Sequence, residues 1–384
     1  MRALFARLPL VLVALGLVLA GCDKDKDVAP PVALVAINAR LSVTRLWDVK
    51  LGGKDKALRL ALAPAADGTR IYAASQDGTV QAFEPKSGRS LWHVKTKLGL
   101  SAGPAVGNGL VVVGTSDGQL LGLEAATGAT RWKVRTTGEV LASPVVAPQA
   151  VVVRTVDGRI HALATDTGKE LWGNEQFIPR LTLRGTSAPV VAGDTVVSAF
   201  DNGKVSAYGL VSGDVLWDTG VSPPHGKTEL ERMVDIDGRI EVSGHDVFVA
   251  GFQGRVAMLA LDSGQVWWSR ELSSYRGLAL DGETLYVTTA DGSVQAMRRR
   301  DGTPVWQQDR LLRRGLTAPV VDGDSLVVVD FEGFVHWLDR ASGALVGRIK
   351  TSKERVTNAP LVADGVVYVQ SDAGRLTALR TRAR

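Results

Sequence analysis

Few side chains in this sequence could carry out catalysis. The 384 residues include one cysteine, Cys22, and five histidines, which show no metal-ligand spacing. A single cysteine cannot form an internal disulfide, and none remains elsewhere for a thiolate nucleophile or a zinc site. No phosphate-binding loop and no Ser/His/Asp motif is recognisable, because the glycines fall in turns. The residue types therefore favour a binding protein that uses no catalytic residue, metal or cofactor.

Two segments combine apolar and charged side chains in a way that suits protein docking. The first reads Leu181-Thr182-Leu183-Arg184-Gly185, and the second ends in Asp235-Ile236-Asp237-Gly238. Leucines supply apolar contact area, while an arginine and two carboxylates supply orientation and reject wrong partners. The candidate protein-binding residues are therefore Leu181, Leu183, Arg184, Asp235 and Asp237.

Cys22 occupies a position that points to lipid attachment. Arg2 and Arg7 precede an uncharged stretch, Leu8–Cys22, which is shorter than the roughly 20 apolar residues that cross a bilayer. A basic start followed by a short apolar run is typical of an export signal. The run ends in Leu19-Ala20-Gly21-Cys22, which resembles a bacterial lipobox. We expect a signal peptide over residues 1–21, and lipidation of Cys22, which would tie the protein to a membrane.

A charged linker follows the cysteine. Alternating Asp and Lys residues and then Pro30-Pro31 predict a flexible tether over residues 22–44. Removal of Arg2 and Arg7 with the signal lowers the formal net charge from +5 to +3. This weak surplus is spread along the chain and gives no support for a nucleic-acid partner.

An internal repeat of about 40 residues specifies the elements that must carry these candidates. Each copy has an initial glycine, a second glycine ten residues later and a tryptophan four residues after that, as in Gly78, Gly88 and Trp92. Eight copies begin at Gly78, Gly118, Gly158, Gly203, Gly254, Gly292, Gly333 and Gly374. In the seventh copy Gly347 stands where tryptophan is expected, and the last copy ends before that position.

Each copy reads as four short strands. Apolar and polar residues alternate over 70–75 and 79–83, and Asp77-Gly78 between them is a strong hairpin signal. Such four-strand repeats stack radially, so the sequence predicts an all-β, eight-bladed β-propeller of antiparallel blades over residues 45–384. The strand around Trp47 should complete the last blade and close the ring. The repeat tryptophans should pack between blades.

The two candidate docking segments interrupt this repeat. The stretches from Trp172 to Pro189 and from Trp217 to Ile240 are longer than the corresponding stretches of most other copies. They occupy the same point of consecutive blades, so they should be neighbours on one rim. Alternatively, Arg184 pairs with Asp235 or Asp237 to pin the loops together while the leucines cover the propeller edge. Both can hold, because a pinned loop is also a preorganised one.

The Asp-Gly, Ser/Thr-Gly and Leu-Trp pattern resembles the quinoprotein repeat. Lipobox, tether, closing tryptophan strand and eight copies come in the order of the BamB family of outer-membrane protein assembly factors, to which the chain is similar over nearly its whole mature length. The resemblance implies a non-enzymatic scaffold lipoprotein of the β-barrel assembly machinery. It assigns the two segments to binding the POTRA domains of BamA, and it makes unfolded outer-membrane proteins a further partner class.

Two other functions remain open from the sequence. One is a periplasmic quinoprotein-type enzyme or ligand sensor, although the mature chain lacks the adjacent cysteines common in quinoprotein dehydrogenases. The other is a lipoprotein adaptor for a different partner. We expect a monomeric propeller anchored in the outer membrane and facing the periplasm. Asp23 leaves the inner membrane open, because an aspartate after the lipidated cysteine resembles the retention signal of enteric bacteria.

Overall fold

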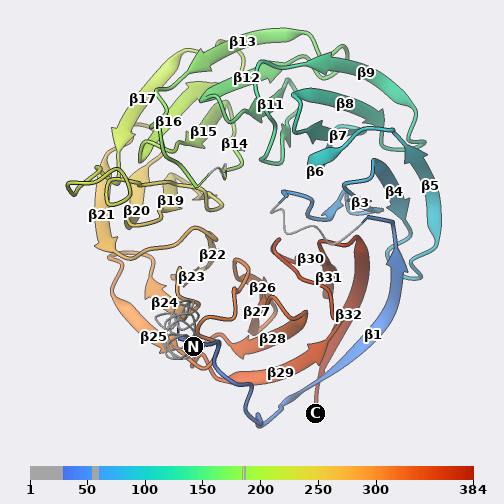
Figure 1. The fold of residues 1–384 in the computed structure, drawn as a ribbon, viewed down its shortest axis with the longest axis vertical. Coiled ribbons are helices and arrows are strands. Elements are labelled where there is room, and N and C mark those ends of the chain that lie inside the picture. Colours follow the sequence, from blue (N-terminus) through green and yellow to red (C-terminus); the bar gives the residue numbers. More distant parts are fainter. Residues whose placement is uncertain (1–28, 54–59, 184, 186) are drawn as a thin grey trace, which may run out of the picture.

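The computed structural model describes residues 29–53, 60–183, 185 and 187–384. Its regular elements are all strands, which form eight four-stranded antiparallel sheets arranged radially around an axis (Figure 1). Within the described residues no helix is long and apolar enough to cross a membrane. The eight-bladed β-propeller predicted from the repeat is therefore confirmed.

In seven of the eight blades the strands run from the axis to the rim in chain order. Blades 1 to 4 contain β2 (Ala65–Ala66), β3 (Ile71–Ala74), β4 (Thr79–Phe83) and β5 (Ser90–Lys95); β6 (Leu100–Gly107), β7 (Leu110–Thr115), β8 (Gln119–Glu124) and β9 (Thr130–Arg135); β10 (Val145–Val146), β11 (Val151–Arg154), β12 (Arg159–Leu163) and β13 (Glu170–Glu175); β14 (Val190–Ala192), β15 (Thr195–Ala199), β16 (Lys204–Gly209) and β17 (Val215–Gly220).

The second half of the ring follows the same plan, with one exception in the last blade. Blades 5 to 8 contain β18 (Glu241–Ser243), β19 (Asp246–Ala250), β20 (Arg255–Ala260) and β21 (Val266–Glu271); β22 (Leu278–Asp281), β23 (Thr284–Thr288), β24 (Val294–Arg298) and β25 (Pro304–Gln308); β26 (Val320–Asp322), β27 (Ser325–Val329), β28 (Phe334–Asp339) and β29 (Leu345–Lys350); β30 (Leu361–Ala363), β31 (Val366–Gln370), β32 (Arg375–Ala383) and β1 (Leu41–Lys50).

The Asp-Gly hairpins owe their shape to side-chain and backbone requirements together. In blade 1 an Asp77 carboxylate oxygen accepts hydrogen bonds from the Ser75 hydroxyl and the Thr79 amide, at 2.6 and 3.3 Å. Gly78 has a φ of 90°, and a Cβ there would lie 2.6 Å from the Leu98 carbonyl oxygen. Only glycine combines this conformation with this close approach, which explains its recurrence in seven of the eight copies; Gly254 of blade 5 does not have a positive φ.

A tryptophan–glycine contact joins successive blades. Trp306 of blade 6 packs against Gly343 of blade 7 so closely that an added Cβ would lie 2.5 Å from the ring. Its indole nitrogen donates a 2.8 Å hydrogen bond to the Arg340 carbonyl of the same turn. The same contact recurs in the pairs Trp47–Gly88, Trp92–Gly128, Trp132–Gly168, Trp172–Gly213, Trp217–Gly264 and Trp268–Gly302. The prediction that these tryptophans pack between blades is confirmed.

In blade 7 the large and the small residue of one cross-strand pair have exchanged strands. In most blades the tryptophan lies opposite a small residue of the neighbouring strand, for example Ala296 opposite Trp306. In blade 7 the large side chain is Trp337 of β28, which is fully buried, and its partner in β29 is Gly347. Trp337, which lies one strand closer to the axis, thus fills the space that a tryptophan at position 347 would occupy.

Strand β1 closes the ring, as predicted. It pairs antiparallel with β32 from Leu41–Ala383 to Lys50–Arg375, and the two lie side by side at the lower right of Figure 1. Trp47 donates a 2.9 Å hydrogen bond to the Pro85 carbonyl of blade 1. The chain thereby joins its first and last blades, so the eighth sheet contains strands from both ends.

The segment before β1 is packed against the ring, which shortens the expected tether. Residues 29–40, called the strap here, run past blades 6 and 7, where Leu34 and Ile37 pack against a buried apolar cluster. The Val32 amide donates to the Leu312 carbonyl at 3.1 Å, and the Arg40 amide donates to the Val346 carbonyl at 2.9 Å. The boundary expected at residue 45 therefore lies several residues too late. The signal peptide and Cys22 lie outside the described residues.

Candidate functional site

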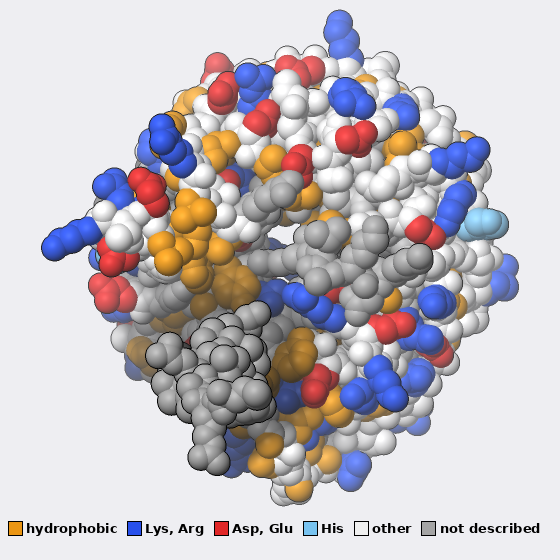
Figure 2. Space-filling view, in the orientation of Figure 1, with side chains coloured by type: hydrophobic (Ala, Val, Ile, Leu, Met, Phe, Trp, Pro, Cys, Tyr) orange, Lys and Arg blue, Asp and Glu red, His pale blue; other side chains and the backbone are white. Residues whose placement is uncertain are grey.

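The two candidate segments lie on the same face of the ring. Antiparallel blades place every connection from an outermost strand to the next innermost strand on one face, called the loop face here, together with the Asp-Gly hairpins. The first loop, residues 176–189, joins β13 to β14, and the second loop, residues 221–240, joins β17 to β18. Figure 2 shows this face, where apolar side chains gather on the side that carries β20 and β21 in Figure 1.

The hairpin turn between β15 and β16 forms hydrogen bonds with the first residues of both loops. The Asn202 side-chain amide donates a 3.0 Å hydrogen bond to the Phe177 carbonyl at the start of the first loop. The Gly203 carbonyl accepts hydrogen bonds from the amides of Val221 and Ser222, at 2.9 and 3.1 Å, where the second loop begins. One turn of blade 4 therefore fixes where both loops leave the ring.

The loops are also fastened to each other further along. The Asp235 carboxylate accepts a hydrogen bond from the Leu183 amide. Gly185 lies against the Asp237 carboxylate, which a side chain at position 185 would overlap. The Ser187 hydroxyl donates a 2.7 Å hydrogen bond to the Gly238 carbonyl. These contacts, called the latch here, confirm that the two loops are neighbours.

The two carboxylates of the candidate site are buried rather than exposed. Asp235 has no exposed surface and Asp237 is only 7% exposed, so neither matches the surface carboxylates expected from the sequence. Burial raises the pKa of Asp235 to about 7, and repulsion from Asp237 and Asp201 adds to this. The Leu183 amide and Arg154 act in the opposite direction. Arg154 is itself buried and forms a 2.5 Å ion pair with Asp201.

The tip of the second loop is a self-contained turn. The Glu231 carboxylate accepts hydrogen bonds from the amides of Lys227 and Thr228, at 2.7 and 3.0 Å. In return the Thr228 hydroxyl accepts one from the Glu231 amide at 3.2 Å, which is the reciprocal pattern of a capping box. The turn holds Leu230 out, with 61% of its surface exposed. The tip is therefore ordered before any partner arrives.

Buried apolar residues hold the base of this turn. Behind the tip, Met233, Val234, Ile236 and Ile240 are buried. The Phe252 amide, in the hairpin between β19 and β20, donates a 2.7 Å hydrogen bond to the Asp235 carbonyl. The second loop thus has an anchored base and an exposed, polar tip that carries one leucine.

Among the described residues of the two loops, besides the prolines, three large apolar side chains are exposed. They are Phe177 at 77%, Leu230 at 61% and Leu181 at 40%, whereas Leu183 is half-buried. The sequence pattern indicated Leu181, but Phe177 and Leu230 were missed. Both lie inside the interruptions of the repeat, where no strand pattern assigns an apolar residue to the core, and this signal could have found them. Arg184 lies outside the described residues.

Few charged groups line the cavity on the axis of the ring. A space of about 380 Å³ is lined mostly by small and apolar residues of the connections and innermost strands, with charged groups from Asp237, Arg239 and Arg276. Among the described residues, no group of three or more His, Cys, Asp or Glu could hold a metal ion. With one carboxylate and two arginines, the lining of this cavity does not fit a calcium-bound quinone.

Comparison with known proteins gives consistent matches. A family model described as "Outer membrane protein assembly factor BamB" matches residues 76–308 and 290–383. A protein of that name from Pseudomonas aeruginosa is 45% identical over 97% of this chain and 98% of its own length. One from Alkalilimnicola ehrlichii is 47% identical over 97% of each chain.

Solved structures agree on the fold. BamB from Moraxella catarrhalis has a TM-score of 0.80 and 29% identity, covering 88% of this chain and all of that one. A europium-containing methanol dehydrogenase has a TM-score of 0.72 at 13% identity, covering 88% of this chain and 93% of that one. At that identity the second similarity concerns the fold alone.

Proposed function

This chain belongs to the BamB family of outer-membrane protein assembly factors, and from that premise we propose that it is a non-enzymatic scaffold whose two loops dock on the POTRA domains of BamA. The scaffold holds those domains in a geometry that helps nascent barrel proteins reach the site of membrane insertion. The observation that carries the proposal is the fastening of the two loops to each other by the latch.

A fastened surface suits tight and specific docking. Ordering a loop on binding costs free energy, so loops that are already held in place bind more strongly for the same contacts. Phe177, Leu181 and Leu230 supply exposed apolar area at the centre of the proposed surface. Polar side chains of the second loop, such as Lys227 and Glu229, are exposed around it and would form its rim.

The proposed roles of the residues follow from their burial. Leu181 contacts the partner together with Phe177 and Leu230, and the three side chains form the apolar core of the interface. Leu183, Asp235 and Asp237 position these side chains from below through the latch. Arg184 keeps the role that its charge predicts, which is orientation of the partner.

The location of the scaffold also belongs to the proposal. Lipidation of Cys22 would hold the ring at the outer membrane facing the periplasm, where its relatives by name act in assembly. Radiolabelled palmitate incorporation that is lost on Cys22→Ser tests the anchor. Separation of inner and outer membranes, followed by detection of the protein in each fraction, tests whether Asp23 retains it in the inner membrane.

A binding assay with purified POTRA domains tests the function. Residues 23–384 should bind, and Phe177→Ala should weaken binding by at least about tenfold, as removal of an interface anchor does. Leu171→Ala is the matched control, because Leu171 is 48% exposed but lies on the outer edge of β13, away from the loops. A wild-type domain that does not bind, or equal losses in both variants, would remove the proposed partner.

A further inference from the structure

The strap forms one wall of a groove on the rim of the ring. Three arginines donate to its carbonyl groups: Arg313 to Pro30 at 2.8 Å, Arg314 to Val32 at 3.2 Å and Arg348 to Val35 at 2.9 Å. Arg314 is only 4% exposed and is held by a 2.7 Å ion pair with buried Asp330. Because Arg314 is buried and ion-paired, it anchors the strap to the ring.

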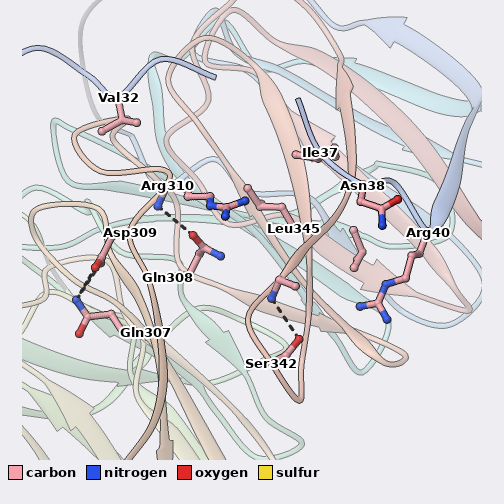
Figure 3. Close-up of a pocket in the computed structure, with 12 residues that line it drawn as sticks. Val32, Ile37, Asn38, Arg40, Gln307, Gln308, Asp309, Arg310, Ser342 and Leu345 are labelled. Carbon is pink, nitrogen blue, oxygen red and sulfur yellow. Dashed lines mark hydrogen bonds between the residues drawn. The ribbon is translucent and has the colours of Figure 1, made fainter. Parts of the chain in front are cut away.

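A cavity of about 910 Å³ lies between the strap and blade 6. Figure 3 shows Ile37, Asn38 and Arg40 of the strap on the right, Gln307–Arg310 on the left and Leu345 between them. Leu345 and Val346 are buried and Ile37 is half-buried, so the floor is apolar. Asn38, Gln307 and Arg310 are exposed and give the walls polar groups. This volume lies within the ~300–1,000 Å³ range of ligand sites.

Both walls are extended backbone. Strand β25 is the outermost strand of blade 6, and no strand of the described chain pairs with its outer edge. The opposite wall, the strap, is itself an extended segment seated on the rim, bonded to β29 through the Arg40 amide and Val346 carbonyl at 2.9 Å. The rim at this junction therefore already binds one extended chain of alternating exposed and half-buried residues.

We propose that this groove binds an extended peptide segment in which apolar and polar residues alternate. The apolar side chains would lie on Ile37, Leu345 and Val346, and the peptide groups would pair with the free edge of β25 and with the amides of Gln307 and Asn38. The strands of outer-membrane barrels have this alternation. The inference rests on the proposed function in that it names where an unfolded client of the scaffold would bind.

The groove differs from the other blade junctions in having two walls. At the junction of blades 4 and 5 the outer strands β17 and β21 also end their sheets, but no strap runs beside them. Blade 5 therefore offers a control position. Ala344 lines the groove, and Gln265 follows the corresponding glycine of blade 5, so both are exposed turn residues in equivalent positions.

The test uses a labelled twelve-residue peptide of alternating valine and threonine, titrated with the full mature protein by fluorescence anisotropy. Ala344→Trp fills the groove and should weaken binding by about tenfold or more, whereas Gln265→Trp should change it by less than about twofold. A peptide N-methylated at every residue should bind as weakly as the filled variant, because it has no N–H group left to pair with a strand edge.

Two results would overturn the inference: no binding of the peptide by the wild-type protein, or equal effects of the two tryptophan substitutions. The POTRA assay separates this outcome from failure of the proposed function. Ala344→Trp leaves both loops unchanged, so it should bind POTRA domains like wild type. Loss of POTRA binding by wild type with retained peptide binding would instead count against the docking proposal alone.

Discussion

Asp235 is buried, yet it holds a residue of the first loop in place. Its carboxylate lies beneath the loop face, accepts the Leu183 amide and is surrounded by Asp237, Asp201 and Arg154. Its sequence neighbours could not reveal this burial, because the second loop has no repeat register that distinguishes inward from outward positions. Phe177 of the first loop differs, because its position inside an interruption of the repeat was a usable sign that it is exposed. The structure shows that a carboxylate, Asp235, fastens the two loops by accepting the Leu183 amide, whereas the Arg184 pairing of the alternative interpretation falls on a residue outside the described ones.

The raised pKa of Asp235 makes stability depend on pH. The folded value of about 7 exceeds the ordinary value of 3.8, so the folded state binds more protons between these pH values. The free energy of unfolding should therefore fall as pH rises from about 4 to 7, by up to about 1.4 kcal/mol for each pH unit in this window. Asp235→Asn cannot ionise and keeps an oxygen for the Leu183 amide.

Urea unfolding at pH 5 and pH 8 measures this effect. The Asp235→Asn variant should lose less stability than wild type between the two pH values, and should be the more stable protein at pH 8. Identical pH dependence in the two proteins would show that Asp235 is ionised in the fold without penalty. Asp235→Ala, which removes the oxygen that holds Leu183, should in addition weaken POTRA binding.

At the scale of elements, the blades are joined by the tryptophan–glycine contacts. The repeat made these contacts predictable, because spacing placed a large residue at the end of one blade and a glycine in the next. The exchange of Trp337 and Gly347 was not predictable, since it keeps volume while breaking the pattern. The strap was missed because it has no strand partner and no periodicity beyond its alternating burial.

Adjacent tryptophans in β21 test the contribution of these contacts. Trp268 is 8% exposed, packs on Gly302 and donates a 2.9 Å hydrogen bond to the Arg299 carbonyl. Its replacement by alanine should cost about 3–5 kcal/mol of unfolding free energy. Trp267 is 56% exposed, so Trp267→Ala should change stability by less than about 0.5 kcal/mol. Similar losses in both variants, measured by chemical denaturation, would show that the blades do not depend on this contact.

At the scale of the whole molecule, closure by β1 joins the first and last blades into one continuous ring. The sequence predicted it from Trp47 alone, and the structure pairs that strand with the C-terminal strand β32. A chain starting at residue 51 lacks the outer strand of blade 8, whereas a chain starting at residue 29 keeps every described residue. Calorimetry should show a loss in the first chain larger than the ~3–5 kcal/mol of a single Trp→Ala. Equal melting of the two chains would contradict closure as a source of stability.

The loops, the latch and the strap all belong to one closed ring, and the proposed function requires this ring to present a preformed loop face to BamA. Photo-crosslinking in cells tests it most directly, with a benzophenone amino acid at position 177, 230 or 324. Asp324 is fully exposed in the turn between β26 and β27, on the opposite face. We expect adducts with BamA from positions 177 and 230 and none from 324. Normal amounts of protein with no adduct from either loop, or equal adducts from all three positions, would contradict the claim.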